Sequence, residues 1–152
     1  MKKLTLLLML LGGLNGCATL SQSSGLQVTD GQGYTRAAEK LLAEVQNANP
    51  ADSAPVAVIA LTSDTESALF KQQDEIIAAM DAEDLGFLYV VGDAAHTYSH
   101  GYHLSQNDSQ QLLGNHQLKI LIVSADGISR NSVTNRTASA RELMTLMANA
   151  RQ

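Results

Sequence analysis

Residues 118–150, "LKILIVSADGISRNSVTNRTASARELMTLMANA", decide the fold. The apolar run from Leu118 to Val123 predicts a buried strand. Asp126-Gly127 is a dipeptide favoured in tight turns, so residues 128–134 should pair back as a second strand. Ser139-Ala140-Arg141-Glu142 has the form of a capping box, which opens a helix. The stretch therefore predicts an antiparallel β-hairpin followed by a helix that packs on the sheet.

Two more buried strands are predicted upstream of this hairpin. Pro55 to Leu61 and Phe87 to Val91 are short apolar runs, and the helix between them should begin at the capping box Ser63-Asp64-Thr65-Glu66. Because a helix joins them, the two strands should be parallel with a right-handed crossover. Further helices are expected from Thr35 to about Asn47 and from Ser105 to Leu113. The predicted order of elements is α-β-α-β-α-β-β-α.

This order of elements resembles the thioredoxin fold. More narrowly, residues 55–150 resemble a family of small secreted bacterial thioredoxin-like proteins of unknown function, and residues 118–150 carry most of that likeness. The resemblance implies an α/β fold in which a four-stranded mixed sheet is joined by an added N-terminal helix.

The residues that give thioredoxin-like enzymes their activity are replaced here. Such enzymes carry Cys-x-x-Cys at the start of the helix after the first core strand, and a cis-proline just before the third. Asp64 and Ser67 hold the positions of the cysteines, and Gln117 lies near the position of the proline. Since a thiolate must be the nucleophile, thiol oxidoreductase activity is not expected, and no catalytic residue is assigned. Ser63, Asp64 and Ser67 instead mark a possible binding edge.

The N-terminus predicts export and lipid attachment. Lys2 and Lys3 precede an apolar run that is too short to span a bilayer, as in a secretory signal. Leu14-Asn15-Gly16-Cys17 resembles the lipobox of bacterial lipoproteins, in which the cysteine becomes the lipidated first residue. We therefore expect a signal peptide over residues 1–16, a lipidated Cys17 with a flexible tether over residues 17–34, and a single thioredoxin-like domain over residues 35–152.

Lipidation would place the domain at a membrane. A thioether-linked diacylglycerol and an N-acyl chain such as palmitate together give stable anchoring, which one chain alone does not. Ala18 follows the cysteine, and in lipoproteins of this kind that implies sorting to the outer membrane, with the domain facing the periplasm. Cys17 is the only cysteine, so the domain can form no disulfide.

Composition limits the partners that the domain can have. The chain carries 10 basic and 15 acidic side chains, a formal net charge of −5 at pH 7. Without a basic patch, nucleic acid is excluded as a partner. The expected contacts are the membrane, through the lipid anchor, and a periplasmic or envelope protein.

Three histidines cluster in residues 95–105, "AHTYSHGYHLS". On a strand, four residues span about 13 Å, which is too far for His96 and His100 to share a metal ion. On a helix, Asp93, His96, His100 and His103 would share one face and could bind zinc or copper. Glycine and serine in the stretch disfavour a helix, so a solvated loop is the first interpretation. A metal site and a pH-responsive surface stay open as alternatives.

The loops that follow two parallel strands emerge at the same edge of a sheet. The turn around Asp64 and the histidine stretch should therefore lie together at the carboxyl edge. The first functional hypothesis is a non-catalytic interaction or accessory module with no cofactor. The alternative is a metal-binding lipoprotein that uses its histidine-rich loop.

Overall fold

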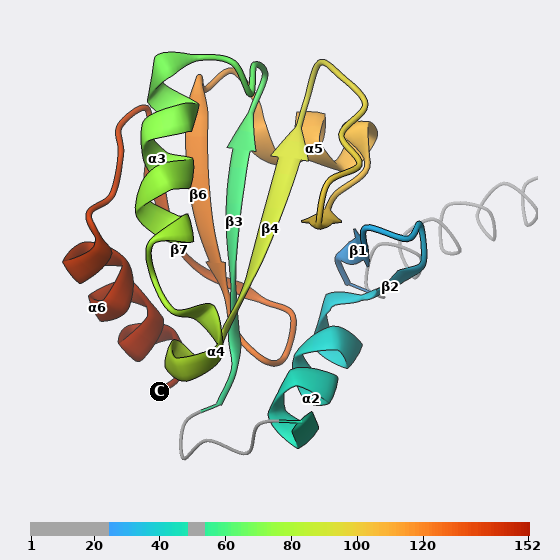
Figure 1. The fold of residues 1–152 in the computed structure, drawn as a ribbon, viewed down its shortest axis with the longest axis vertical. Coiled ribbons are helices and arrows are strands. Elements are labelled where there is room, and N and C mark those ends of the chain that lie inside the picture. Colours follow the sequence, from blue (N-terminus) through green and yellow to red (C-terminus); the bar gives the residue numbers. More distant parts are fainter. Residues whose placement is uncertain (1–24, 49–53) are drawn as a thin grey trace, which may run out of the picture.

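The computed structural model describes residues 25–48 and 54–152. Four longer strands make up most of its sheet: β3 (Val56–Thr62), β4 (Phe87–Asp93), β6 (Leu118–Val123) and, at one edge, β7 (Ser129–Thr134). β3 pairs in parallel with β4 and antiparallel with β6, and β6 pairs antiparallel with β7. These are the four strands predicted from the sequence, in the mixed arrangement expected of them (Figure 1).

Three short strands extend the sheet beyond the predicted four: β1 (Gln27–Thr29), β2 (Thr35–Ala37) and β5 (Tyr102–His103). β5 pairs in parallel with β4, while β1 pairs antiparallel with both β5 and β2. Across the described residues the order is β2-β1-β5-β4-β3-β6-β7, so the sheet has seven strands rather than four. Strands of two or three residues are too short to show a hydrophobic period, which is why they were not predicted.

The predicted boundary between tether and domain was wrong. Gln27–Thr29 already pairs in the sheet, so the folded part begins before residue 35. Thr35 does not cap a helix either, because Thr35–Ala37 is strand β2 and α2 begins after it, at Ala38. The predicted signal peptide and Cys17 lie outside the described residues.

Five helices among the described residues complete the fold: α2 (Ala38–Ala48), α3 (Ala68–Ala78), α4 (Ala82–Leu85), α5 (Gln106–Leu113) and α6 (Ala140–Ala150). The predicted caps of the last two are confirmed. Ser105 accepts a hydrogen bond from the amide of Asp108, and Ser139 accepts one from the amide of Glu142, each at 3.1 Å. No described helix combines the length and apolarity needed to cross a membrane.

The start of α3 differs from the prediction. Its cap is Ser67, whose hydroxyl accepts the amide hydrogen of Phe70 at 3.2 Å, rather than Ser63. The carboxylate of Asp64 accepts the amide hydrogen of Glu66 at 2.9 Å and so forms a turn before the helix. The helix begins four residues later than expected because this Asp-centred turn satisfies the local amides first.

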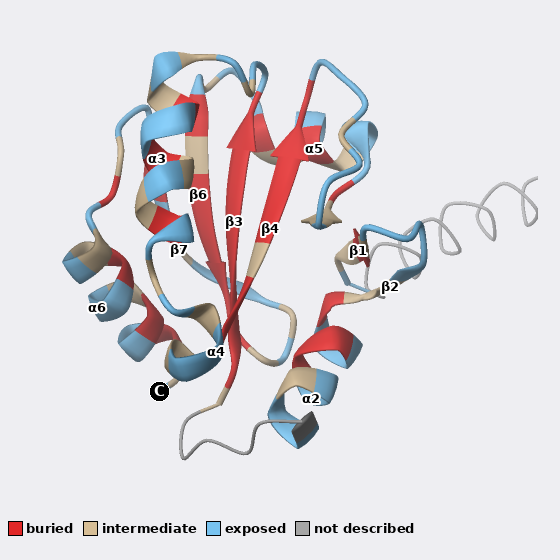
Figure 2. Cartoon of the chain, in the orientation of Figure 1, coloured by how far each residue is buried: buried red, intermediate tan, exposed pale blue. Residues whose placement is uncertain are grey.

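Both faces of the sheet are covered, which explains the unbroken apolar runs of its central strands. The side chains of β3 alternate between two cores: Val58 packs with α3 and α6, and Ile59 packs with α2 and α5. Figure 2 shows β3, β4 and β6 buried along nearly their whole length. Each fully buried Leu or Ile side chain contributes about 1.5–3 kcal/mol to the stability of the fold. These two cores therefore stabilise the sheet.

The two parallel strands end side by side at the upper edge of the molecule in Figure 1. Thr62 at the end of β3 pairs with Asp93 at the end of β4. Next to Asp93, Gly92 lies so close to α5 that an added Cβ would be 2.6 Å from the Ser109 hydroxyl oxygen. This close packing fixes the point at which the histidine-rich loop leaves the sheet.

Candidate functional site

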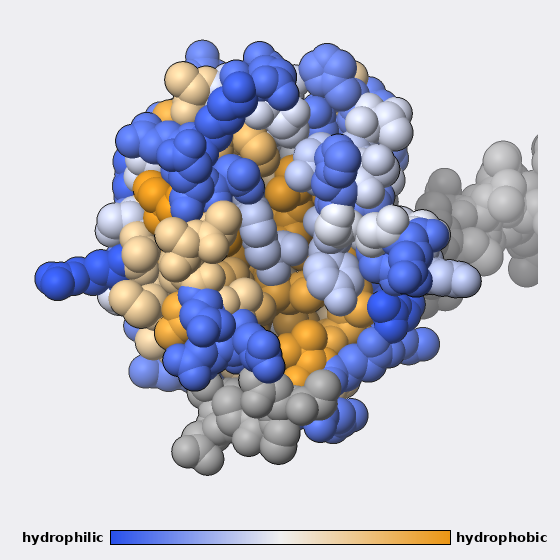
Figure 3. Space-filling model, in the orientation of Figure 1, coloured by the Kyte–Doolittle hydropathy of each residue, from blue (hydrophilic) through white to orange (hydrophobic). Residues whose placement is uncertain are grey.

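A groove of about 520 Å³ lies at the carboxyl edge of the sheet. One side is formed by the β3–α3 turn and the first turns of α3, and the other by residues 96–100. We call it the carboxyl-edge groove. The expectation that the turn around Asp64 and the histidine stretch lie together is confirmed. Figure 3 shows that hydrophilic side chains dominate the upper part of this view, with hydrophobic ones between them.

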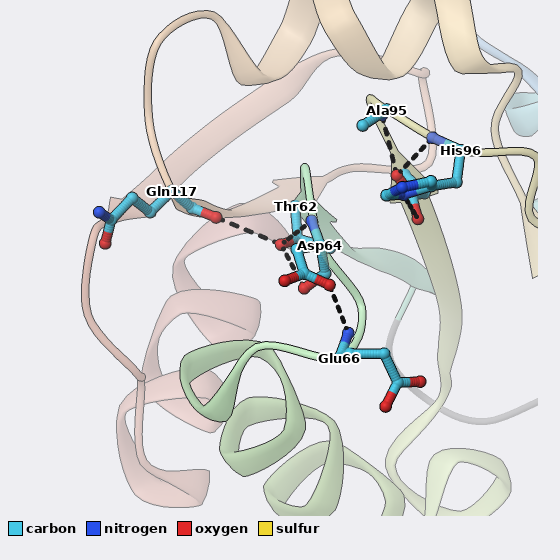
Figure 4. A network of polar contacts seen from close by, with 7 residues as sticks. Thr62, Asp64, Glu66, Ala95, His96 and Gln117 are labelled. Atoms are coloured by element: carbon cyan, nitrogen blue, oxygen red, sulfur yellow. Dashed lines mark hydrogen bonds and ion pairs between the residues drawn. The ribbon is translucent and has the colours of Figure 1, made fainter.

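Asp93 and His96 line the groove and form a polar pair, and Figure 4 shows the ring of His96 beside the end of β4. Asp93 is 2% exposed, and its Oδ1 accepts the amide hydrogens of Ala95 and His96, both at 2.9 Å. Its Oδ2 lies 3.3 Å from Nδ1 of His96. A buried carboxylate is costly unless it is hydrogen-bonded, and these three contacts supply the bonds. They also fix the ring of His96, although 65% of that side chain is exposed.

This pair determines which nitrogen of His96 is available to a ligand. In the neutral ring, Nδ1 next to the carboxylate carries the hydrogen, and Nε2 is the acceptor. No described residue hydrogen-bonds to Nε2. The structure therefore presents one oriented imidazole acceptor at the groove.

The β3–α3 turn is held by the hydroxyl group of Thr62. That oxygen accepts the amide hydrogen of Asp64 at 3.1 Å and lies 3.3 Å from the carbonyl oxygen of Gln117 (Figure 4). The hydroxyl thus ties the turn to the segment before β6. Gln117 occupies the place where the resemblance implies a cis-proline, and the described residues contain no cis peptide bond.

The predicted binding-edge residues divide between two hollows. Asp64 lines both the groove and a neighbouring hollow of about 280 Å³, whereas Ser63 and Ser67 line only the smaller one. The hydroxyl of Ser67 already serves as the cap of α3. Asp64 and Ser67, which the resemblance places at the positions of the enzyme thiols, therefore make structural hydrogen bonds.

Acidic side chains give the groove a negative character. Its lining includes the carboxylates of Asp64, Glu66, Asp74 and Asp93 and a single ammonium group, that of Lys71. Lys71 is 2.8 Å from Glu66, and that hydrogen bond raises the pKa of the lysine above its ordinary value. Because Lys71 is paired, it does little to offset the other carboxylates.

Tyr98 lines the groove, and Tyr89 contacts the lining residue Asp74; neither tyrosine was named as a site residue from the sequence. The hydroxyl of Tyr89 donates a 2.7 Å hydrogen bond to Asp74, and burial together with that bond raises the pKa of Tyr89. Burial, and then the carboxylates of Asp74 and Asp93, raise the pKa of Tyr98. Asp74 follows Phe70 by one helical turn, and this spacing was the only signal that could have placed it at the groove.

The four residues of the predicted metal site do not come together. Asp93 contacts His96, but Tyr98 packs edge-on against both His100 and His103, with ring centroids 5.5 Å and 6.2 Å away. Nδ1 of His103 lies 3.0 Å from the carbonyl oxygen of Gly101. Within residues 25–48 and 54–152, no group of three or more His, Cys, Asp or Glu side chains is placed to hold a metal ion. Zinc or copper binding therefore stays a prediction from the sequence, without support from this geometry.

Comparisons with known proteins show the fold. The sequence matches no protein-family model and no curated protein at a significant level. A putative electron transfer protein from Aquifex aeolicus VF5 is similar in structure, with a TM-score of 0.54 and 9% identity over 84% of this chain and 90% of that one. A mitochondrial 2-Cys peroxiredoxin from Plasmodium falciparum has a TM-score of 0.53 and 7% identity over 82% and 87% of the two chains. The protein thus has the thioredoxin-like α/β fold predicted from its sequence.

Proposed function

We propose that this domain is a non-catalytic binding module, anchored to the outer membrane by lipid on Cys17 and facing the periplasm, whose carboxyl-edge groove receives an envelope protein. One observation carries the proposal. Asp64 and Ser67, which the resemblance places at the thiol positions, make structural hydrogen bonds, and the described residues contain no cysteine. The site thus lacks the thiolate that the fold's usual chemistry requires.

The shape of the groove supports binding of another protein. Its walls come from two loops that follow different strands, and residues such as Ser99 and His100 are exposed on its rim. An open, polar cleft with fixed hydrogen-bonding groups suits a side chain or short segment that a partner inserts from outside. The two cores behind the strands keep both walls in place.

The lipid anchor is tested separately from the groove. Cys17→Ser should move the protein from the outer-membrane fraction to the soluble periplasm when envelopes are separated on a density gradient. It should also abolish incorporation of labelled palmitate. Retention of the substituted protein in the membrane fraction would contradict the anchor.

Partner binding is tested by site-specific photo-crosslinking in intact envelopes. A photoreactive residue replacing Ser99 should give one crosslinked product of defined mass, whereas the same residue at the exposed position Gln110 on α5 should not. The product should also disappear when Asp74→Asn or His96→Asn is added. If the crosslink forms equally at both positions, or survives both groove substitutions, the proposal fails.

A further inference from the structure

The charge of the groove indicates what kind of group it can hold. Asp64 and Asp74 line it, and Lys71, the one lysine or arginine of the lining, pairs with Glu66 at 2.8 Å. An anionic ligand would meet like charges here, whereas a cationic ligand would meet complementary ones. The charge of the groove favours a cationic ligand over an anionic one, but charge alone does not define a site.

The Asp93–His96 pair gives an independent and more specific observation. Asp93 is 2% exposed and uses both carboxylate oxygens on its own loop, so its charge is not offered directly to a ligand. Instead it orients His96, and in the neutral ring the remaining nitrogen, Nε2, is an acceptor with no described partner. An acceptor oriented by a buried carboxylate at the edge of a groove is placed to accept a hydrogen bond from an N–H or O–H group of a ligand.

The groove also has an aromatic side chain in its wall. Tyr98 lines it, is half-buried and is held by edge contacts with His100 and His103, whereas Phe70, also in the lining, is 4% exposed and belongs to the core. Aromatic rings attract cations, and planar cations also stack on them. A ligand that is positive, planar and rich in N–H donors meets all three properties of the groove.

We propose that the carboxyl-edge groove binds the guanidinium group of an arginine side chain presented by the partner, which deepens the binding role proposed above and rests on it. The guanidinium carries five N–H donors in one plane, so it can reach the Nε2 acceptor of His96 and a carboxylate such as that of Asp74 together. An ammonium group is a compact point charge without a planar face, so it matches a site with an aromatic side chain and separated acceptors less well.

The binding test uses a matched pair of small probes. The isotope-labelled full chain carrying Cys17→Ser is titrated with N-acetyl-arginine amide and, separately, with N-acetyl-citrulline amide. Citrulline replaces the guanidinium by a neutral urea of nearly the same shape. Arginine should cause saturable shifts in the amide resonances of residues 63–67 and 94–101, and should bind at least about tenfold more tightly than citrulline. Equal binding of both probes, or no saturable shift, would overturn the proposal.

Two substitutions identify the groups that bind the probe, and a third serves as the control. Asp74→Asn removes a charge, yet the amide oxygen can still accept the Tyr89 hydrogen bond. His96→Asn keeps an N–H donor for Asp93 and removes the Nε2 acceptor. Each should weaken arginine binding by about five- to tenfold, the loss of one charge-assisted or oriented hydrogen bond. Glu75→Gln makes the same change of charge on the exposed face of α3 outside the groove and should change affinity less than about twofold.

The outcome distinguishes this proposal from the broader one. If arginine fails to bind but the crosslink from position 99 still depends on Asp74 and His96, the groove binds a partner through another group and only the guanidinium proposal fails. If arginine binds while no groove-dependent crosslink forms in envelopes, the guanidinium site stands and the partner-binding role fails. Equal weakening of binding by Glu75→Gln and Asp74→Asn would show a diffuse charge effect and would overturn the site.

Discussion

The buried carboxylate of Asp93 holds the exposed ring of His96, with Oδ2 3.3 Å from Nδ1 and Oδ1 bonded to the amide of the same residue. One aspartate thus fixes both the backbone and the side chain of the first histidine in the loop. The other two histidines of the cluster contact Tyr98 instead. Three histidines that look equivalent in the sequence therefore have different roles in the structure.

Gln73 should be essential for stability although it is polar. It is fully buried, and its side-chain amide exchanges two hydrogen bonds with the backbone of Ala138, at 3.1 Å and 2.6 Å. Gln73→Leu would leave the backbone amide and carbonyl of Ala138 without partners. We therefore expect the free energy of unfolding to fall by about 2–4 kcal/mol. Urea unfolding of the full chain measures it. Gln72→Leu, at the exposed neighbouring position, should change stability by about 0.5 kcal/mol or less, and equal effects of the two substitutions would contradict this account.

Any side chain at position 92 should lower the stability of the fold. An added Cβ would lie 2.5 Å from a methyl carbon of Leu61 and 2.6 Å from the hydroxyl oxygen of Ser109. We expect Gly92→Ala to cost about 1–3 kcal/mol in unfolding experiments. Gly31→Ala, whose nearest contact would be 3.6 Å, is the control and should be nearly neutral.

A double-mutant cycle locates the source of this cost. Combining Gly92→Ala with Ser109→Ala removes the hydroxyl oxygen that the new methyl group would meet. The double substitution should therefore be more stable than the sum of the two single effects implies. Strict additivity would show that the contact with Ser109 is not the cause.

Tyr89 should make the fold sensitive to alkaline pH. Burial and the bond to Asp74 raise its pKa in the folded state, so the folded chain keeps the proton above pH ~10 while the unfolded chain loses it. This contribution to stability is complete below the unfolded pKa and is lost as pH rises above it, by up to about 1.4 kcal/mol per pH unit. Tyr89→Phe should flatten this decline, measured as midpoint denaturant concentration against pH. Tyr34→Phe, at a residue 67% exposed, should leave it unchanged.

The histidine loop should hold no metal tightly. Because its imidazoles do not converge, calorimetric titration of the full chain with zinc or with copper should show no saturable tight binding. Stoichiometric binding that the triple change of His96, His100 and His103 to alanine abolishes would support the alternative prediction from the sequence and contradict the geometry described above.

The central strands were predictable because their signals are local and strong. Leu118–Val123 is a continuous apolar run bounded by turn residues, and Ser105 and Ser139 cap the helices that follow them. The short strands were not predictable, since β5 exists only through pairing with β4 and β1. The cap predicted at Ser63 was wrong because its capping pattern competes with the turn around Asp64. The sequence alone does not show which of the two structures forms.

The site was predictable in location and not in detail. The topology of parallel strands places the turn at Asp64 and the loop after Asp93 at one edge. The contact of Tyr89 with Asp74 joins a strand to a helix, and the contacts of Tyr98 depend on how the loop folds back. Such contacts depend on tertiary packing, which hydrophobic periodicity does not report.

The most direct test of the site is to determine which tautomer of His96 is present. Long-range ¹H–¹⁵N correlation spectra of the labelled full chain carrying Cys17→Ser, recorded in mildly alkaline buffer, report which ring nitrogen holds the hydrogen. We predict hydrogen on Nδ1, next to Asp93, with a free Nε2, and loss of this preference in Asp93→Ala. Hydrogen on Nε2 in the parent chain would contradict the account, because the groove would then lack the acceptor on which guanidinium binding depends.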